Sequence, residues 1–289
     1  MKLALGTVQF GLDYGAFNPG GQVGDDEVTA ILHSAEESGI DTLDTARAYG
    51  TSEAVLGRHG APSRFRVVTK IRALAGEPDV PAAVAASISA SRNALGTDRL
   101  DTLLFHSAPD LLGETGSAAW HAAEAARDRG EVRALGVSVY DHEEALAIAA
   151  RFPIRAVQLP VNIFDQRAIS TGALARLKDQ GVEIHARSIF LQGFALSSPD
   201  SLPENLQRFR PALEQFREFV ARCGTTPLAA ALEFVLGQDA IDRVVVGVQK
   251  KSELDEVVAA SLRHPELMGA HHIGSNDPIL INPAKWGTI

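Results

Sequence analysis

Cysteine is nearly absent from this 289-residue chain, and the single Cys223 has no partner for an internal disulfide. This usage is typical of a reducing compartment. No apolar run approaches the roughly 20 residues that a membrane-spanning helix needs. Residues 1–10 carry one basic side chain and lack the apolar stretch of a signal peptide. We therefore expect a cytoplasmic protein without a membrane partner.

Positive charge is also scarce. Lysine and arginine number 27 against 36 aspartates and glutamates, which gives a formal net charge of −9. Such an excess keeps a protein soluble and opposes binding to a phosphate backbone. Apolar residues make up 45% and charged residues 22%, which is ordinary for a globular protein with a large core. We predict a small-molecule substrate, no nucleic-acid partner, and a monomer or weak homo-oligomer.

Several common site motifs are missing. The chain has no H-E-x-x-H or C-x-x-C, and His271-His272 lies in a polar segment, so we expect no metal site. No G-x-G-x-x-G follows a strand, which argues against a Rossmann cofactor site. Residues 136–140 lack the final glycine of a nucleophile elbow, and residues 6–11 are not followed by the Lys-Ser/Thr of a phosphate loop. Zinc, serine-hydrolase and P-loop chemistry are therefore disfavoured.

Short β-rich runs alternate with longer helical runs along the whole chain, which is typical of a parallel sheet built from βα units. The expected strands are residues 2–8, 40–43, 66–69, 102–105, 134–139, 156–159, 182–186 and 243–246. The expected helices are residues 25–38, 81–95, 118–129, 143–151, 172–180, 211–222, 227–236 and 252–262. No linker or low-complexity tract interrupts the pattern. The sequence predicts one α/β domain over residues 1–289, a (β/α)8 TIM barrel.

Four polar residues follow three successive expected strands, and the carboxyl ends of barrel strands form the active-site face. Asp44 and Tyr49 follow the second strand, Lys70 ends the third, and His106 ends the fourth. An ammonium beside a phenol stabilises the phenolate, and a carboxylate would hold that ammonium charged. An imidazole can donate to a carbonyl oxygen and orient it. The set suits protonation of an oxyanion as hydride reaches its carbon.

Other interpretations stay open at this point. Asp44 and Lys70 could form a structural ion pair, and Tyr49 could simply pack. Lys70 could act as the Schiff-base nucleophile of a lyase, although a charged Asp44 would oppose the neutral amine this requires. The chain could also be a cofactor-binding regulatory subunit without turnover.

Three segments carry a resemblance to a known family. Residues 41–50 (DTLDTARAYG), 68–71 (VTKI) and 104–106 (LFH) resemble the signature segments of the aldo-keto reductases. The resemblance covers nearly the whole chain and extends to residues 5–11, 136–138, 157–162, 187–193 and 246–249. It implies a barrel that reduces an aldehyde or ketone with NAD(P)H. Tyr49 would be the general acid, Lys70 its activator, Asp44 the residue that orients Lys70, and His106 the carbonyl-orienting residue.

The resemblance also implies cofactor contacts. The nicotinamide carboxamide would lie on Ser138 and Gln158, and the remaining contacts would come from Gly6, Thr7, Asp44, Arg187, Ser188, Leu191, Gly193, Lys250 and Glu256. No metal is implied.

The sequence departs from the family pattern at several positions. Val139 replaces an asparagine that usually follows the strand-five serine, and Val257 replaces an adenine-binding asparagine. Arg187 replaces the aromatic that commonly stacks on the nicotinamide; it can stack itself or bind an anionic substrate or a phosphate. Glu253 stands where many family members have an Arg or Gln that binds the adenosine 2′-phosphate. Its negative charge would repel that phosphate, and Lys250-Lys251 could compensate for this repulsion. We predict NADPH, with NADH possible as the alternative. In the tail, Trp286 is a candidate wall of the cavity or a packing residue.

Overall fold

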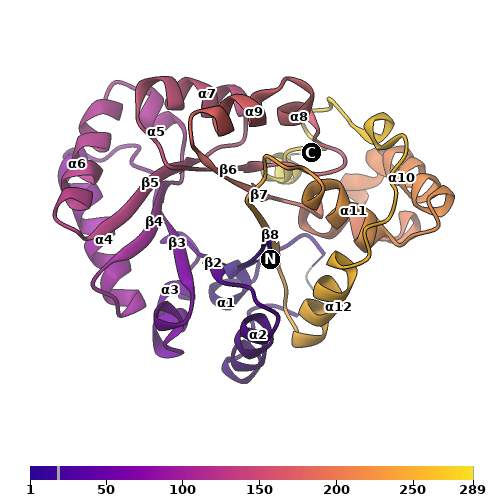
Figure 1. Ribbon diagram of the computed structural model, residues 1–289, viewed down its shortest axis with the longest axis horizontal. Helices are drawn as coiled ribbons and strands as arrows, with labels where there is room; N and C mark the ends of the chain where they lie inside the picture. The colour runs from indigo at the N-terminus through magenta and orange to yellow at the C-terminus, as the bar shows by residue number, and fades with distance from the viewer. Residues whose placement is uncertain (18–19, 289) are drawn as a thin grey trace.

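The computed structural model of the protein describes residues 1–17 and 20–288. Eight parallel strands close into a barrel in the order of the sequence, with β1 paired to both β2 and β8, and helices cover its outside (Figure 1). The strands are β1 (Leu3–Gly6), β2 (Thr42–Asp44), β3 (Arg66–Ile71), β4 (Leu100–Phe105), β5 (Val132–Ser138), β6 (Ala156–Pro160), β7 (Glu183–Arg187) and β8 (Arg243–Gly247). The predicted (β/α)8 fold is confirmed.

The helices follow the strands as the crossover connections of a parallel barrel must. The longer α-helices are α2 (Asp25–Glu37), α3 (Ser52–Arg58), α4 (Val80–Leu95), α6 (Gly116–Asp128), α7 (His142–Arg151), α9 (Ala173–Asp179), α10 (Arg210–Arg222), α11 (Pro227–Leu236) and α12 (Lys251–Ser261). Short α1 (Val8–Gly11), α5 (Pro109–Leu112) and α8 (Arg167–Ser170) and the 3-10 turns η1 (Ala61–Ser63), η2 (Leu191–Leu196), η3 (Pro199–Ser201), η4 (Glu204–Phe209), η5 (Ala270–Ile273) and η6 (Pro283–Thr288) complete the chain.

Helix α4 shows how local sequence sets these boundaries. The Asp79 side chain accepts a hydrogen bond from the backbone N–H of Ala82, and Pro81 lies in the first turn, where its missing N–H costs nothing. The helix ends at Gly96, whose φ of 66° is the left-handed conformation that glycine adopts without strain. Val84, Ile88 and Leu95 then form a buried stripe against the barrel at helical spacing.

Several expected boundaries differ from the structure by one or two residues, and two further differences concern the first strand and helix α3. The first strand ends at Gly6 and not at residue 8, because the N–H and hydroxyl of Thr7 both donate to the carbonyl of Asp44 and turn the chain into α1. Helix α3 was not predicted. It spans only seven residues, too few for a helical period to show in sequence.

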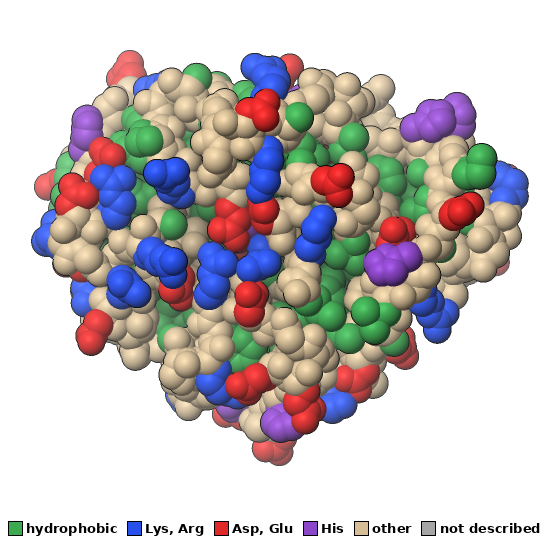
Figure 2. Space-filling view, viewed as in Figure 1, with side chains coloured by type: hydrophobic (Ala, Val, Ile, Leu, Met, Phe, Trp, Pro, Cys, Tyr) green, Lys and Arg blue, Asp and Glu red, His purple; other side chains and the backbone are tan. Residues whose placement is uncertain are grey.

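The surface is mixed in charge. Figure 2 shows acidic and basic side chains next to one another across one face, with apolar side chains between them. Within the described residues, no single helix is long and apolar enough to cross a membrane. The segments Glu204–Arg222 and Pro227–Leu236 pass that test of length and composition only as a pair, with a bend of 87° between them.

Candidate active site

A cavity of about 980 Å³ opens at the carboxyl ends of the strands, where barrel enzymes carry their active sites. Its lining includes Asp44 of β2, His106 after β4, Ser138 of β5 and Gln158 of β6. It continues past the ends of β7 and β8. The volume lies at the upper end of the range for small-molecule and cofactor sites.

Lys70 lies beneath the floor of this cavity, fully buried on β3. Its ammonium donates to both carboxylate oxygens of Asp44, at 2.8 and 2.7 Å, and to the carbonyl of Thr45 at 2.9 Å. The Tyr49 hydroxyl is 3.5 Å from the same nitrogen. Burial by itself would lower the pKa of Lys70, but the charges of Asp44 and Tyr49 and the hydrogen bonds to both outweigh it and raise that pKa. The amine is therefore charged.

The backbone around Tyr49 is held by close packing. Gly50 has a φ of 55°, and a Cβ on it would lie 2.3 Å from the carbonyl oxygen of Gly11. A Cβ on Gly11 would in turn lie 1.9 Å from the Tyr49 carbonyl oxygen. Only glycine fits at either position. A buried hydroxyl of Ser52 bonds to Thr7 and fixes the start of α3 beneath the same loop.

His106 completes the polar end of the cavity. Its ring lies edge-on to that of Tyr49, with 5.7 Å between centroids and 79° between planes. Burial, with the nearby charge of Lys70, lowers the pKa of His106 to about 4, and Arg187 acts in the same direction. The imidazole is therefore neutral at pH 7 and can donate one N–H without adding charge.

This neutral histidine predicts the shape of the pH profile. Since the pKa of His106 is about 4, the logarithm of kcat/KM should not bend near the ordinary histidine value of about 6.5. Activity should fall only as the pH approaches 4, where a second cation forms beside Lys70. The test is a pH profile of the wild type and of His106→Gln, which keeps a donor but cannot titrate. A bend near 6.5 that disappears in His106→Gln would contradict the expectation.

Two polar groups face the middle of the cavity. The Ser138 hydroxyl makes no hydrogen bond to any described residue, and Gln158 uses only its amide nitrogen, which donates to Asp44 at 2.6 Å. Ser138 and Gln158 are aligned neighbours on β5 and β6. One hydroxyl and one free amide oxygen therefore remain for a ligand carboxamide.

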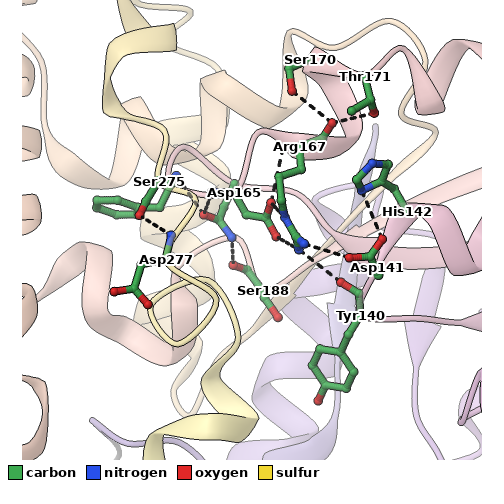
Figure 3. A network of polar contacts seen from close by, with 12 residues as sticks. Tyr140, Asp141, His142, Asp165, Arg167, Ser170, Thr171, Ser188, Ser275 and Asp277 are labelled. Atoms are coloured by element: carbon green, nitrogen blue, oxygen red, sulfur yellow. Dashed lines mark hydrogen bonds and ion pairs between the residues drawn. The ribbon is translucent and has the colours of Figure 1, made fainter.

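The backbone that follows β7 is held by a side-chain hydrogen bond from Asn162. Ser188 has a φ of 58°, a strained value for a residue with a side chain, and its carbonyl accepts from Asn162 at 3.1 Å. Asn162 is itself buried and accepts two backbone N–H bonds. Figure 3 shows Ser188 near the network in which Arg167 joins Asp141 and Asp165.

Comparison with known proteins agrees with this architecture. The sequence profile of the Aldo/keto reductase family matches residues 2–267. The chain belongs to the aldo-keto reductase family. It is 29% identical over 304 residues to D-threo-aldose 1-dehydrogenase from a Pseudomonas species, which covers 88% of this chain and 89% of that protein. It is 29% identical over 209 residues to 6-dehydroglucose reductase from Agrobacterium fabrum, covering 63% and 66%.

Solved structures show the same fold. The holo form of an aldo-keto reductase from Bacillus halodurans superposes with a TM-score of 0.74 at 20% identity, over 94% of this chain and 90% of that one. Family membership makes this chain an oxidoreductase of carbonyl and CH–OH groups. Aldo-keto reductases generally use a nicotinamide cofactor.

Most residues expected at the reductase site do come together. The cavity is lined by Gly6, Thr7, Asp44, Tyr49, His106, Ser138, Gln158, Arg187, Ser188, Gly193 and Lys250. Lys70 lies just behind this lining, in contact with Asp44. Leu191 and Glu256 do not line it: Leu191 is fully buried in the core, and Glu256 is exposed on α12. Trp286 also lies elsewhere, buried against Phe194, so the expectation of a cavity wall is wrong and that of a packing residue holds.

Sequence reasoning missed several cavity residues. Tyr14 and Phe17 come from the loop after β1, Tyr140 from the loop after β5, and Gln192 from the loop after β7. Gln192 accepts from the Ala16 N–H and donates to the Tyr14 hydroxyl, so it ties two loops together. Only Tyr140 closely follows a strand, which was the available signal; Tyr14 and Phe17 come after α1, and Gln192 lies in η2.

Proposed function

We propose that this single barrel domain, residues 1–289, reduces an aldehyde or ketone to an alcohol with NADPH. One observation carries the proposal: a buried, charged Lys70 contacts both the Asp44 carboxylate and the Tyr49 hydroxyl at the floor of a cavity of cofactor size. A bound reduced nicotinamide supplies the hydride.

The chain's own residues would handle the proton. A carbonyl oxygen placed between Tyr49 and His106 would accept a hydrogen bond from each. As negative charge develops on that oxygen, the Tyr49 hydroxyl would transfer its proton to it, and the Lys70 ammonium would stabilise the resulting phenolate. Asp44 would keep Lys70 charged and aimed at the phenol. His106, being neutral, would orient the carbonyl without competing as a proton source.

The residues present fit a nicotinamide cofactor. The free groups of Ser138 and Gln158 match a carboxamide, and the cavity runs from there past η2 to Lys250 and Glu253 at the end of β8. A Schiff-base lyase is less well supported, because the raised pKa of Lys70 opposes the neutral amine that it needs.

The first experiment is a cofactor-oxidation assay. The purified protein should oxidise NADPH only when a carbonyl compound is present. The panel should include aldoses, which the relatives' names suggest, together with aromatic aldehydes and phosphorylated carbonyls. Borohydride trapping of a substrate on Lys70 would favour the lyase. A partner protein that responds to cofactor redox state, without turnover, would favour a regulatory subunit.

Glu253 offers a test of cofactor choice. It lies in the first turn of α12 at the far end of the cavity, where its carboxylate accepts from the Gln249 N–H at 2.8 Å. Glu253→Arg should tighten NADPH binding about tenfold or more, since a charge-assisted hydrogen bond to a phosphate contributes about 1.5–3 kcal/mol. NADH binding should barely change. Fluorescence titration of both cofactors measures this.

Glu256→Arg is the comparison, because it adds the same charge to the same helix outside the cavity lining. Equal tightening in both variants would mean that any cation on α12 suffices. Equal effects of Glu253→Arg on NADPH and NADH would place Glu253 away from the adenosine ribose. A wild type that already prefers NADH would contradict the NADPH proposal.

A further inference from the structure

Arg187 is a cation that lines the cavity and makes no ion pair with any carboxylate of residues 1–17 and 20–288. Its guanidinium donates to the Ser188 hydroxyl at 3.2 Å and to the Val139 carbonyl at 2.9 Å. It also lies over the ring of Tyr140, 4.3 Å from the centroid. Two of its five N–H groups are thus used, and no acidic residue of the described chain lies within ion-pair distance.

The carboxylates that could neutralise it are otherwise engaged. Asp44 is paired with the lysine at the floor of the site. Asp141 and Asp165 are both bound to Arg167, at 2.9 and 2.8 Å (Figure 3). Because a partly buried cation is costly unless paired, the missing counter-charge points to a ligand.

The guanidinium is also held in place. One acceptor is the backbone carbonyl of Val139, a buried residue directly after β5, and the other is the hydroxyl of Ser188, whose backbone carbonyl is held by Asn162. The ring of Tyr140 covers one face of the guanidinium. A planar guanidinium whose N–H donors are already held in position loses little conformational entropy when it binds a planar anion.

The other residues near Tyr49 do not compensate the positive charge of Arg187. The Lys70–Asp44 pair is neutral as a unit, and His106 is uncharged at pH 7 because its pKa is about 4. Arg187 is one of the charges that lower this pKa, so it acts on the same end of the cavity as Tyr49. Lys250 also lines the cavity, but it follows β8 and so lies at another part of the cavity from Tyr49.

We propose that Arg187 determines substrate specificity by binding a carboxylate on the carbonyl substrate. The substrate class is therefore an aldehyde or ketone that also carries a carboxylate, such as a sugar acid or an oxo acid. One guanidinium balances one negative charge, whereas a phosphate monoester of about −1.5 to −2 would leave excess charge at this end. This inference rests on the proposed function in that Tyr49 marks the carbonyl end.

The test compares ligands that differ only in charge. Benzoate and benzamide have nearly the same shape, and their binding to the protein, with and without nicotinamide cofactor, can be measured by calorimetry without any turnover. Benzoate should bind the wild type at least tenfold more tightly than benzamide. Arg187→Met should weaken benzoate binding roughly 10- to 100-fold, the loss expected for a charge-assisted bond, and leave benzamide unchanged. Arg187→Lys keeps the charge but not the paired N–H donors of a guanidinium, so its benzoate affinity should lie between those of the wild type and Arg187→Met.

Arg133→Met is the matched control, since Arg133 is exposed near the opposite end of β5 and lies outside the cavity. It should retain the wild-type preference for benzoate. A turnover arm compares glucuronate with glucose: Arg187→Met should raise KM for the acid by a much larger factor than KM for the neutral sugar.

Several outcomes would overturn the inference. These are equal wild-type affinities for benzoate and benzamide, no measurable binding of benzoate, or tighter binding of phenylphosphonate than of benzoate. Equal weakening of both ligands or of the cofactor by Arg187→Met would instead assign the guanidinium to stacking on the nicotinamide. Failure of the proposed function is distinct, because the protein would then bind benzoate through Arg187 yet oxidise no cofactor with any carbonyl.

Discussion

Tyr49→Phe should lower kcat for carbonyl reduction about 10²–10⁴-fold, the usual contribution of a general acid–base group. The substitution removes only the hydroxyl, which lies 3.5 Å from the ammonium of Lys70, and keeps the ring that packs edge-on to His106. Cofactor affinity should stay nearly unchanged, because the carboxamide partners proposed above lie on β5 and β6. Steady-state kinetics and a cofactor titration on the same preparation measure both quantities.

Tyr140→Phe is the natural comparison, since it removes a hydroxyl from the rim of the same cavity. Its effect on kcat should be far smaller, because Tyr140 does not contact the Lys70 ammonium. If folded Tyr49→Phe turned over at the wild-type rate, Tyr49 would not be the proton donor. Water or another side chain would then have to supply the proton.

The fold was predictable because its signals are local and repeated. Helical runs that end in glycine or begin with proline recur between apolar strands, and α4 with its Pro81 start and Gly96 end shows why such signals hold. The four residues proposed for catalysis were also predictable as a group. Once the strands are parallel, the ends of β2, β3 and β4 must meet at one rim, so Asp44, Lys70 and His106 must approach one another.

The parts that could not be predicted depend on non-local packing. Tyr14 and Gln192 are 178 residues apart, and only the folded barrel brings their loops into hydrogen-bond contact. Helix α3 is too short for a visible period and is placed by Ser52 bonding to Thr7. Trp286 could not be assigned because its partners, Phe194 and the Ile279 carbonyl, follow from the path of the tail.

Arg187 was predictable from the sequence only in part. Its place at the end of β7 followed from the strand pattern, and its charge marked it as unusual for that position. Whether it stacks on a ring or faces a ligand depended on Val139, Ser188 and Tyr140, which come from two separate loops. Spacing in the sequence does not encode that arrangement.

Lys70→Met should also nearly abolish carbonyl reduction, because no cation would then stabilise the phenolate that forms when Tyr49 gives up its proton. The change leaves the Asp44 carboxylate buried, and among the described residues only Gln158 remains as its side-chain donor. Breaking a buried ion pair in this way typically costs about 3–5 kcal/mol of stability. Lys178→Met, on the outer helix α9, carries the same substitution at an exposed ion pair with Asp242 and should keep both activity and stability.

The double variant Asp44→Asn/Lys70→Met separates catalysis from folding. Because it removes both charges, it should recover much of the unfolding free energy that Lys70→Met loses, as measured by urea denaturation. Its activity should stay as low as that of the single variant, since the cation beside Tyr49 is still missing. Recovery of activity together with stability would show that Lys70 and Asp44 are only a structural pair, and the proposed proton transfer would then have to proceed without them.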